Sequence, residues 1–163
     1  MGAYYYASGQ KIELDDDADH VAVDRQAAAR AGVEIPASPG MHAAGGIVIA
    51  PRSAFDETAL QRLQKAGALQ PVYKRDRAVV VAMPEVRIEV DNAQQHAKVM
   101  KVLGEASAGH TIADDSPDRI VVRPASGNGE DALRIANRVY ERAKPASASV
   151  RFVQVVPKPD LVR

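Results

Sequence analysis

The chain has no cysteine and no tryptophan among its 163 residues, and aromatic residues make up only 4% of it. Without cysteine, disulfide bonds, thiolate metal ligands and thiol nucleophiles are excluded. With so few aromatic side chains, the hydrophobic core has to be built from valine, isoleucine, leucine and alanine. Such a core suits a β-sheet that is covered by helices with small side chains on their buried faces.

The chain also has no excess of charge of either sign, because 21 acidic residues balance 21 basic ones. A net charge of zero gives no electrostatic argument for binding nucleic acid. No window approaches the roughly 20 apolar residues of a membrane-spanning helix, so no membrane contact is expected. The first residues, MGAYYYASGQKIEL, lack the basic start and apolar run of a signal peptide, which gives a cytoplasmic location by default.

The segment at 47–60, IVIAPRSAFDETAL, returns without a gap at 120–133 as IVVRPASGNGEDAL. Each copy has an apolar β-branched run, then a turn with proline and serine, then the acidic start of a helix rich in alanine and leucine. Self-similarity of this kind indicates repeated structural units. The chain is therefore predicted to contain two similar strand–helix units in tandem.

The second half of the chain predicts the order strand, helix, strand, strand, helix, strand. Apolar β-branched runs predict the strands, and apolar residues at helical spacing predict the helices, most clearly at 130–143. These six elements are expected at 86–90, 91–103, 110–113, 119–123, 130–143 and 150–156. A separate strand is predicted at 77–83, divided from the next by Pro84.

The first half repeats this order less cleanly, with strands at 20–24, 47–50 and 69–73, helices at 25–31 and 56–66, and a loop at 34–46. The predicted class is α+β, with tandem ferredoxin-like (βαββαβ) units whose helices cover one face of antiparallel sheets. An N-terminal hairpin and the first unit would occupy 1–80, and the second unit with an extended tail 81–163. The hairpin at 4–14 is expected to extend one of the sheets.

One turn has the glycine pattern of a dinucleotide-binding loop, G-x-G-x-x-A, at Gly127, Gly129 and Ala132. Glu130 and Asp131 stand in the first turn of the following helix, where they would repel a phosphate. The first copy of the repeat lacks both glycines. The pattern therefore indicates an ordinary strand-to-helix turn, and no cofactor is expected.

No set of residues has the spacing of a metal or catalytic centre. The acidic run before His20 lacks the alternate carboxylates, central glycine and final glutamate of a calcium loop. The candidates considered are Asp15, Asp16, Asp17, Asp19 and the histidines His20, His42, His96 and His110. No histidine pair has zinc-ligand spacing and no serine lies in G-x-S-x-G. A non-catalytic protein without metal is predicted; a small enzyme, the alternative, requires His20 or His110 near the acidic loops.

Three segments of the second half and the start of the chain resemble a known family. These are DRIVVRP at 118–124, EDALRIANRVYERA at 130–143, VRFVQVVPKPD at 150–160, and YYYASGQKIEL followed by HVAVD near the N-terminus. Together they resemble the N-terminal prodomains of subtilisin-like serine proteases, closest to the fervidolysin type. The protease's own motifs, D-T-G, H-G-T and G-T-S-M-A, are absent from the sequence.

The resemblance implies a prodomain or protease-associated domain that assists folding of the protease and then inhibits it. Its partner would be the protease catalytic domain, in the same chain or in trans. The sheet would lie on two parallel helices of the protease, capped by an acidic turn at Asp114, Asp115 and Asp118. The tail would enter the substrate cleft as an extended strand formed by Pro159, Asp160, Leu161, Val162 and Arg163.

A second hypothesis is a ligand-sensing or assembly module built from paired ferredoxin-like units. The sheet edges at 4–14 would then favour pairing between copies of the chain. Which unit meets a partner stays open at this point.

Overall fold

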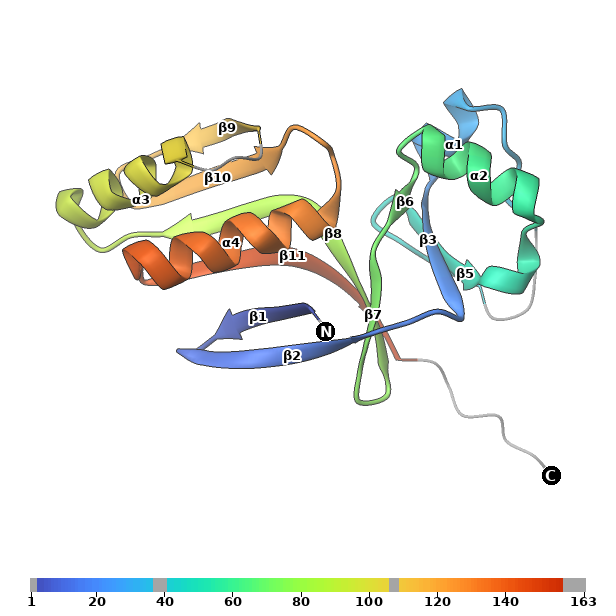
Figure 1. Ribbon diagram of the computed structural model, residues 1–163, viewed down its shortest axis with the longest axis horizontal. Coiled ribbons are helices and arrows are strands. Elements are labelled where there is room, and N and C mark those ends of the chain that lie inside the picture. Colours follow the sequence, from blue (N-terminus) through green and yellow to red (C-terminus); the bar gives the residue numbers. More distant parts are fainter. Residues whose placement is uncertain (1–2, 37–40, 106–108, 157–163) are drawn as a thin grey trace. The chain divides into compact units, whose positions relative to one another are not determined.

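The computed structural model describes residues 3–36, 41–105 and 109–156, and it confirms the predicted α+β class, with helices and antiparallel sheets (Figure 1). The described residues divide into two compact units. Unit 1 lies within 1–14 and 82–152, and unit 2 within 15–81 and 153–163. One division falls between Val81 and Ala82, close to the expected boundary at residue 80. The grouping differs from the expected one in the N-terminal hairpin, which belongs with the second half of the chain, and in residues 153–156, which belong with the first.

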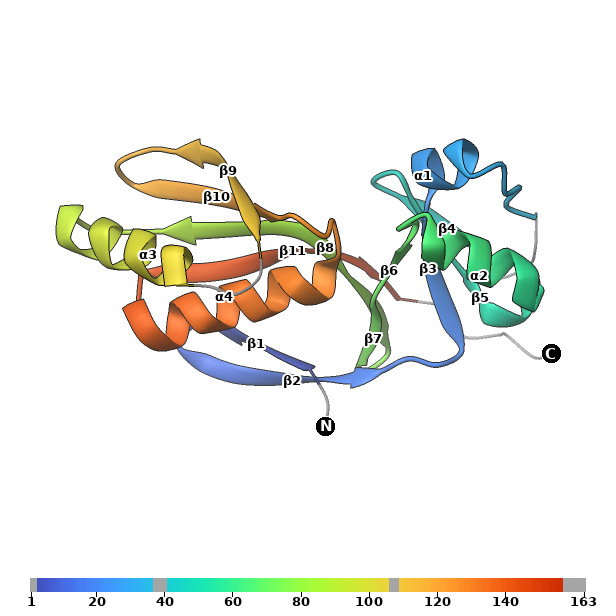
Figure 2. The same ribbon diagram turned by 45° about the horizontal axis from the view of Figure 1, so that its top comes forward.

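Unit 1 combines a hairpin with two helices and four further strands. In chain order its elements are β1 (Ala3–Ala7), β2 (Gln10–Asp16), β8 (Ala78–Glu89), α3 (Ala93–Glu105), β9 (His110–Asp115), β10 (Arg119–Pro124), α4 (Gly129–Ala143) and β11 (Ser147–Val155). Strands β10 and β11 both pair with β8, and β9 pairs with β10 in a hairpin (Figure 2). The start of β8 and the ends of β2 and β11 belong to unit 2.

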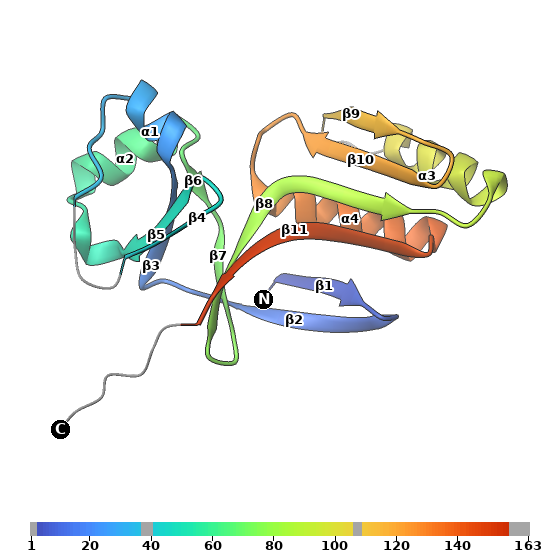
Figure 3. The same cartoon turned by 180° about the vertical axis from the view of Figure 1, so that it is seen from behind.

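The helices of unit 1 cover one face of its sheet. Side chains alternate along paired strands, so neighbours in register point to the same face. Ile88 lies opposite Ile120 and both are fully buried, whereas Arg87, opposite Val121, is exposed. Helices α3 and α4 contact each other, and Figure 3 shows both of them behind the strands.

Strand β8 runs through Pro84, where the sequence predicted a break between two strands. Residues 78–81 pair with β7 (Val72–Arg75), and residues 86–89 pair with β10. Proline has no amide hydrogen to donate to a sheet. Here it lies between the two paired stretches, so the strand continues without losing a hydrogen bond to β7 or β10.

Contacts between β1 and α4 place the N-terminal hairpin in unit 1. The ring of Tyr6 stacks on Tyr140 with centroids 4.5 Å apart. The hydroxyls of Tyr4 and Tyr6 donate to the same oxygen of Glu141, at 3.0 and 2.6 Å. The side chain of Asn137 donates to the Tyr4 carbonyl at 2.8 Å. These contacts join residues more than 130 positions apart, so no local pattern could predict them.

The Tyr6–Glu141 hydrogen bond predicts a loss of stability at high pH. Mainly through this bond, the pKa of Tyr6 rises from 10.0 to about 12. Because the folded-state pKa of Tyr6 is raised, its hydroxyl contributes fully to folding stability below pH 10, and this contribution is lost between pH 10 and about 12. We expect the stability difference between wild type and Tyr6→Phe to be constant below this window and to shrink across it. Denaturation at several pH values measures this, and a constant difference would contradict it.

Unit 2 contains a second, smaller sheet and two helices. Its elements are β3 (His20–Asp24), α1 (Arg25–Arg30), β4 (His42–Ala44), β5 (Ile47–Pro51), a 3₁₀ turn (Arg52–Ala54), α2 (Glu57–Lys65), β6 (Leu69–Gln70) and β7. The strand order is β4-β5-β3-β6, with antiparallel neighbours. Strand β4 falls in a segment predicted as loop, because a three-residue strand beside glycines has too short a pattern to recognise.

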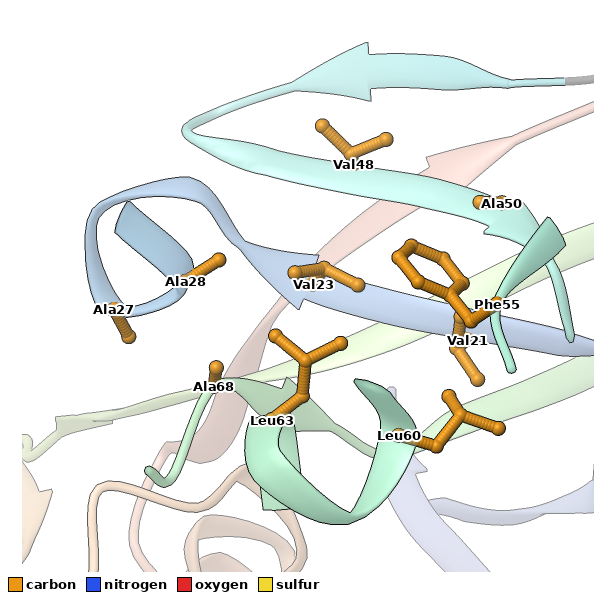
Figure 4. Close-up of a cluster of buried hydrophobic side chains, with 10 residues drawn as sticks. All are labelled: Val21, Val23, Ala27, Ala28, Val48, Ala50, Phe55, Leu60, Leu63 and Ala68. Atoms are coloured by element: carbon orange, nitrogen blue, oxygen red, sulfur yellow. The ribbon is translucent and has the colours of Figure 1, made fainter. Parts of the chain in front are cut away.

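The core of unit 2 lies between this sheet and the two helices. Figure 4 shows Leu60 and Leu63 of α2 and the ring of Phe55 turned toward Val21 and Val23 of β3. Helix α2 begins at its cap Asp56, whose carboxylate accepts from the Ala59 amide at 2.7 Å. The two leucines of α2, which are three residues apart and so share one face of the helix, are therefore its buried positions.

Candidate functional site

The acidic turn joins β9 to β10 at one end of the sheet of unit 1. The Ser116 amide donates to the Arg119 carbonyl at 2.8 Å, and the Arg119 amide donates back at 3.3 Å. The carbonyl of Asp118 accepts from the Val90 amide at 3.0 Å, which fixes the turn to the end of β8. The structure thus holds Asp114, Asp115 and Asp118 in one anchored hairpin.

The three carboxylates of the turn are not equally available. Asp114 accepts from Arg119 and from the Ser116 hydroxyl, each at 2.9 Å, and these hydrogen bonds lower the pKa of its carboxyl. Asp115 contacts Nε2 of His96 at 2.7 Å. Within the described residues the side chain of Asp118 has no hydrogen bond or ion pair. Because a carboxylate offers about four acceptor positions, all three retain capacity for another donor.

The sheet face that unit 1's helices leave uncovered carries charged side chains of both signs. By register, six of these belong to β8, β9 and β10, and they are Glu85, Arg87, Glu89, Asp114, Arg119 and Arg123. Arg151 of β11 joins them because it lines the same pocket as Arg87. Two ion pairs cross it, Arg119 to Asp114 at 2.9 Å and Arg123 to Glu85 at 3.5 Å. Val121 lies among them and is only 8% exposed.

A pocket of about 320 Å³ opens on this face between β8 and β11. Glu85, Arg87, Ser149, Val150 and Arg151 line it. Sequence reasoning did not select these residues. The alternation of charged and apolar residues along each strand was a usable signal, but their proximity depends on β11 pairing with β8, which spacing alone does not reveal.

The other half of the expected site lies outside the described residues. It is the tail formed by Pro159, Asp160, Leu161, Val162 and Arg163. Its proposed entry into a substrate cleft therefore stays a prediction. Strand β11 ends at Val155.

The acidic run before His20 has a structural role for its one buried member. Oδ1 of Asp17 accepts from the amides of Asp19 and His20, at 2.8 and 3.1 Å. Its Oδ2 lies 2.9 Å from Nδ1 of His20. Among the described residues, no group of three or more histidines and acidic residues is placed to hold a metal ion.

The glycine-rich turn before α4 is closed by its own side chains. Asn128 caps the helix, accepting from the Glu130 amide at 2.8 Å, and the Ser126 hydroxyl donates to Asp131 at 2.6 Å. The acidic groups that a phosphate would meet are thus built into the helix start. This agrees with an ordinary strand-to-helix turn.

None of the helices in the described part of the chain is long and apolar enough to span a membrane. Comparisons with models of protein families, with curated proteins and with solved structures find no match to this chain.

Proposed function

We propose that the chain is a non-catalytic protein-binding domain of the subtilase-prodomain type, which assists folding of a subtilisin-like protease and inhibits it. The observation that carries this proposal is the sheet of unit 1, whose helices α3 and α4 lie on one face only. The other face is charged and bounded by the acidic turn. Such a face is available to a partner that brings its own helices.

The order of strands supports a ferredoxin-like assignment for each unit. In unit 1 the elements β8-α3-β9-β10-α4-β11 form neighbours in the order β11-β8-β10-β9. In unit 2 the elements β3-α1-β4-β5-α2-β6 form the order β6-β3-β5-β4. Both are a split βαβ arrangement, in which the first strand lies between the third and the fourth. The repeat at 47–60 and 120–133 corresponds to the third strand and second helix of each unit.

The acidic turn suggests that the N-termini of the partner's helices would lie at this end of the sheet. Helix N-termini carry partial positive charge and unpaired amides, which carboxylates stabilise by about 0.3–1 kcal/mol each when exposed. The side chain of Asp118 has no hydrogen bond or ion pair in the described part of the chain, so it is the most available carboxylate for capping a partner's helix. A partner that is already folded would also help a protease whose parallel sheet has many long-range contacts and forms slowly.

The proposal predicts tight inhibition of a subtilisin-like protease from the same source. The full chain is titrated against the protease beside a form ending at Val156. We expect removal of the tail to weaken inhibition by at least about tenfold, because strand addition in the cleft contributes main-chain hydrogen bonds. Asp118→Asn should weaken it about two- to fivefold, and Asp16→Asn, which removes an exposed charge elsewhere, should not.

A second readout tests the folding role. The denatured protease is refolded with and without the chain, and recovered activity is followed after the chain has been digested. Faster recovery with the chain supports the proposal. If a cognate protease is neither inhibited by the full chain nor refolded faster, the proposal is wrong.

One observation favours the alternative of a ligand-sensing module, namely the pocket between β8 and β11. Ligand binding there without any effect on a protease would favour that alternative.

A further inference from the structure

We propose that the pocket between β8 and β11 binds a small, doubly charged oxyanion through Arg87 and Arg151. The two residues lie on adjacent strands, and both line the same cavity of about 320 Å³. Pockets for small molecules span roughly 300–1,000 Å³, so this one suits a compact ligand such as a dicarboxylate or a phosphate. The inference goes beyond the proposed function and does not depend on it.

The charges around the pocket do not cancel. Of the described residues that line it, only Glu85 is acidic, and it is paired with Arg123 at 3.5 Å. Arg119, on the same face, is paired with Asp114. Arg87 and Arg151 are exposed and have no hydrogen bond or ion pair within the described residues. Arg87 and Arg151 therefore line the pocket without an ion-pair partner in the described part of the chain, and the lining carries more positive than negative charge; the nearest further carboxylate along β8 on this face is Glu89, two residues from Arg87.

The chemistry of these groups selects oxyanions. A guanidinium presents donors in a planar fork that matches a carboxylate or phosphate with two parallel hydrogen bonds. Two such forks in one pocket favour a ligand with two anionic groups, or one doubly charged group, over a monocarboxylate. Ser149 adds a hydroxyl that donates to or accepts from the same ligand.

The test is a titration with succinate, inorganic phosphate and acetate. The ionic strength is held constant, because at low salt a doubly charged anion would bind any cluster of cationic side chains more strongly. Amide chemical shifts of isotope-labelled protein report both the affinity and the position of binding. We expect saturable shifts centred on 85–87 and 149–151 for succinate or phosphate, and much weaker binding of acetate. The stronger of the first two ligands identifies the class of anion.

The decisive variant is Arg87→Gln with Arg151→Gln. Its matched control is Lys98→Gln with Lys101→Gln, which removes the same charge from exposed positions of α3. The control should bind as wild type does, and the arginine variant should lose at least about tenfold in affinity, since two charge-assisted contacts are removed. Both variants change exposed residues, and a well-dispersed spectrum verifies that each is folded. Equal losses in the two variants, shifts centred elsewhere, or no saturable binding of any ligand would overturn the proposal.

Discussion

Replacing Gly129 by alanine is expected to destabilise unit 1 by about 3 kcal/mol or more, a larger effect than most overpacking substitutions. A Cβ atom at this position would lie 1.8 Å from the carbonyl oxygen and 2.4 Å from the carbonyl carbon of Ala82. Both are backbone atoms of β8, so no flexible side chain can move aside. The first turn of α4 would have to separate from the strand, which opens a core that is otherwise fully buried.

Two other glycines provide the controls for this prediction. A Cβ atom added at Gly104, in α3, would have no neighbour within 4 Å among the described residues, so Gly104→Ala should stabilise the helix by up to about 1 kcal/mol. Gly127 is equally unobstructed but has φ +67°, so Gly127→Ala should cost roughly 1–2 kcal/mol from backbone strain alone. Urea denaturation followed by circular dichroism ranks the three. A loss below about 0.5 kcal/mol for Gly129→Ala would show that the close approach to Ala82 is unimportant.

This close approach also explains the glycine pattern that suggested a nucleotide. The first copy of the repeat has Asp56 where the second has Gly129. In α2 that aspartate is the helix cap, whereas α4 is capped one residue earlier, by Asn128. Gly129 thus enters the helix and faces β8, where no side chain fits. The glycine is required for packing, and a binding loop is not needed to account for it.

Local patterns predicted most of the elements but not how they group. Helix α4 was expected at 130–143 and runs from Gly129 to Ala143, because its apolar spacing and acidic first turn are both local signals. The allocation of the hairpin to unit 1 depends on the contacts of Tyr4 and Tyr6 with Glu141, which are remote in sequence. The grouping of the hairpin with the first half was expected from the order of elements alone, and such an order contains no information about these contacts.

The same limit applies to the site. The resemblance directed attention to Asp114, Asp115 and Asp118, and the structure places them in one hairpin. It could not indicate that Arg119 and His96 already contact two of the three. Nor could it indicate that Arg87 and Arg151 line one pocket, because that follows from the pairing of β11 with β8.

Replacing Leu63 by alanine is expected to destabilise unit 2 by about 2–5 kcal/mol. Leu63 is 0% exposed and lies in the cluster with Phe55, Val21 and Val23, so the shortened side chain leaves a cavity that its neighbours only partly fill. The adjacent, exposed Gln64→Ala should change stability by less than about 0.5 kcal/mol. Amide hydrogen exchange reports the protection of both units in one experiment. We expect Leu63→Ala to lower the protection of unit 2 alone, and an equal loss of protection in both units would contradict this prediction.

Independent unfolding is expected because β8 has two separate ladders. Residues 78–81 pair with β7 in unit 2, whereas residues 86–89 pair with β10 in unit 1. Loss of the first ladder leaves the second intact, so amides of β10 and α4 should keep their protection in Leu63→Ala.

The Leu63→Ala variant also shows which unit meets a partner. If the uncovered sheet face of unit 1 is the docking surface, inhibition of a protease by Leu63→Ala stays within about twofold of wild type. Loss of inhibition with unit 1 still protected would assign the docking surface to unit 2.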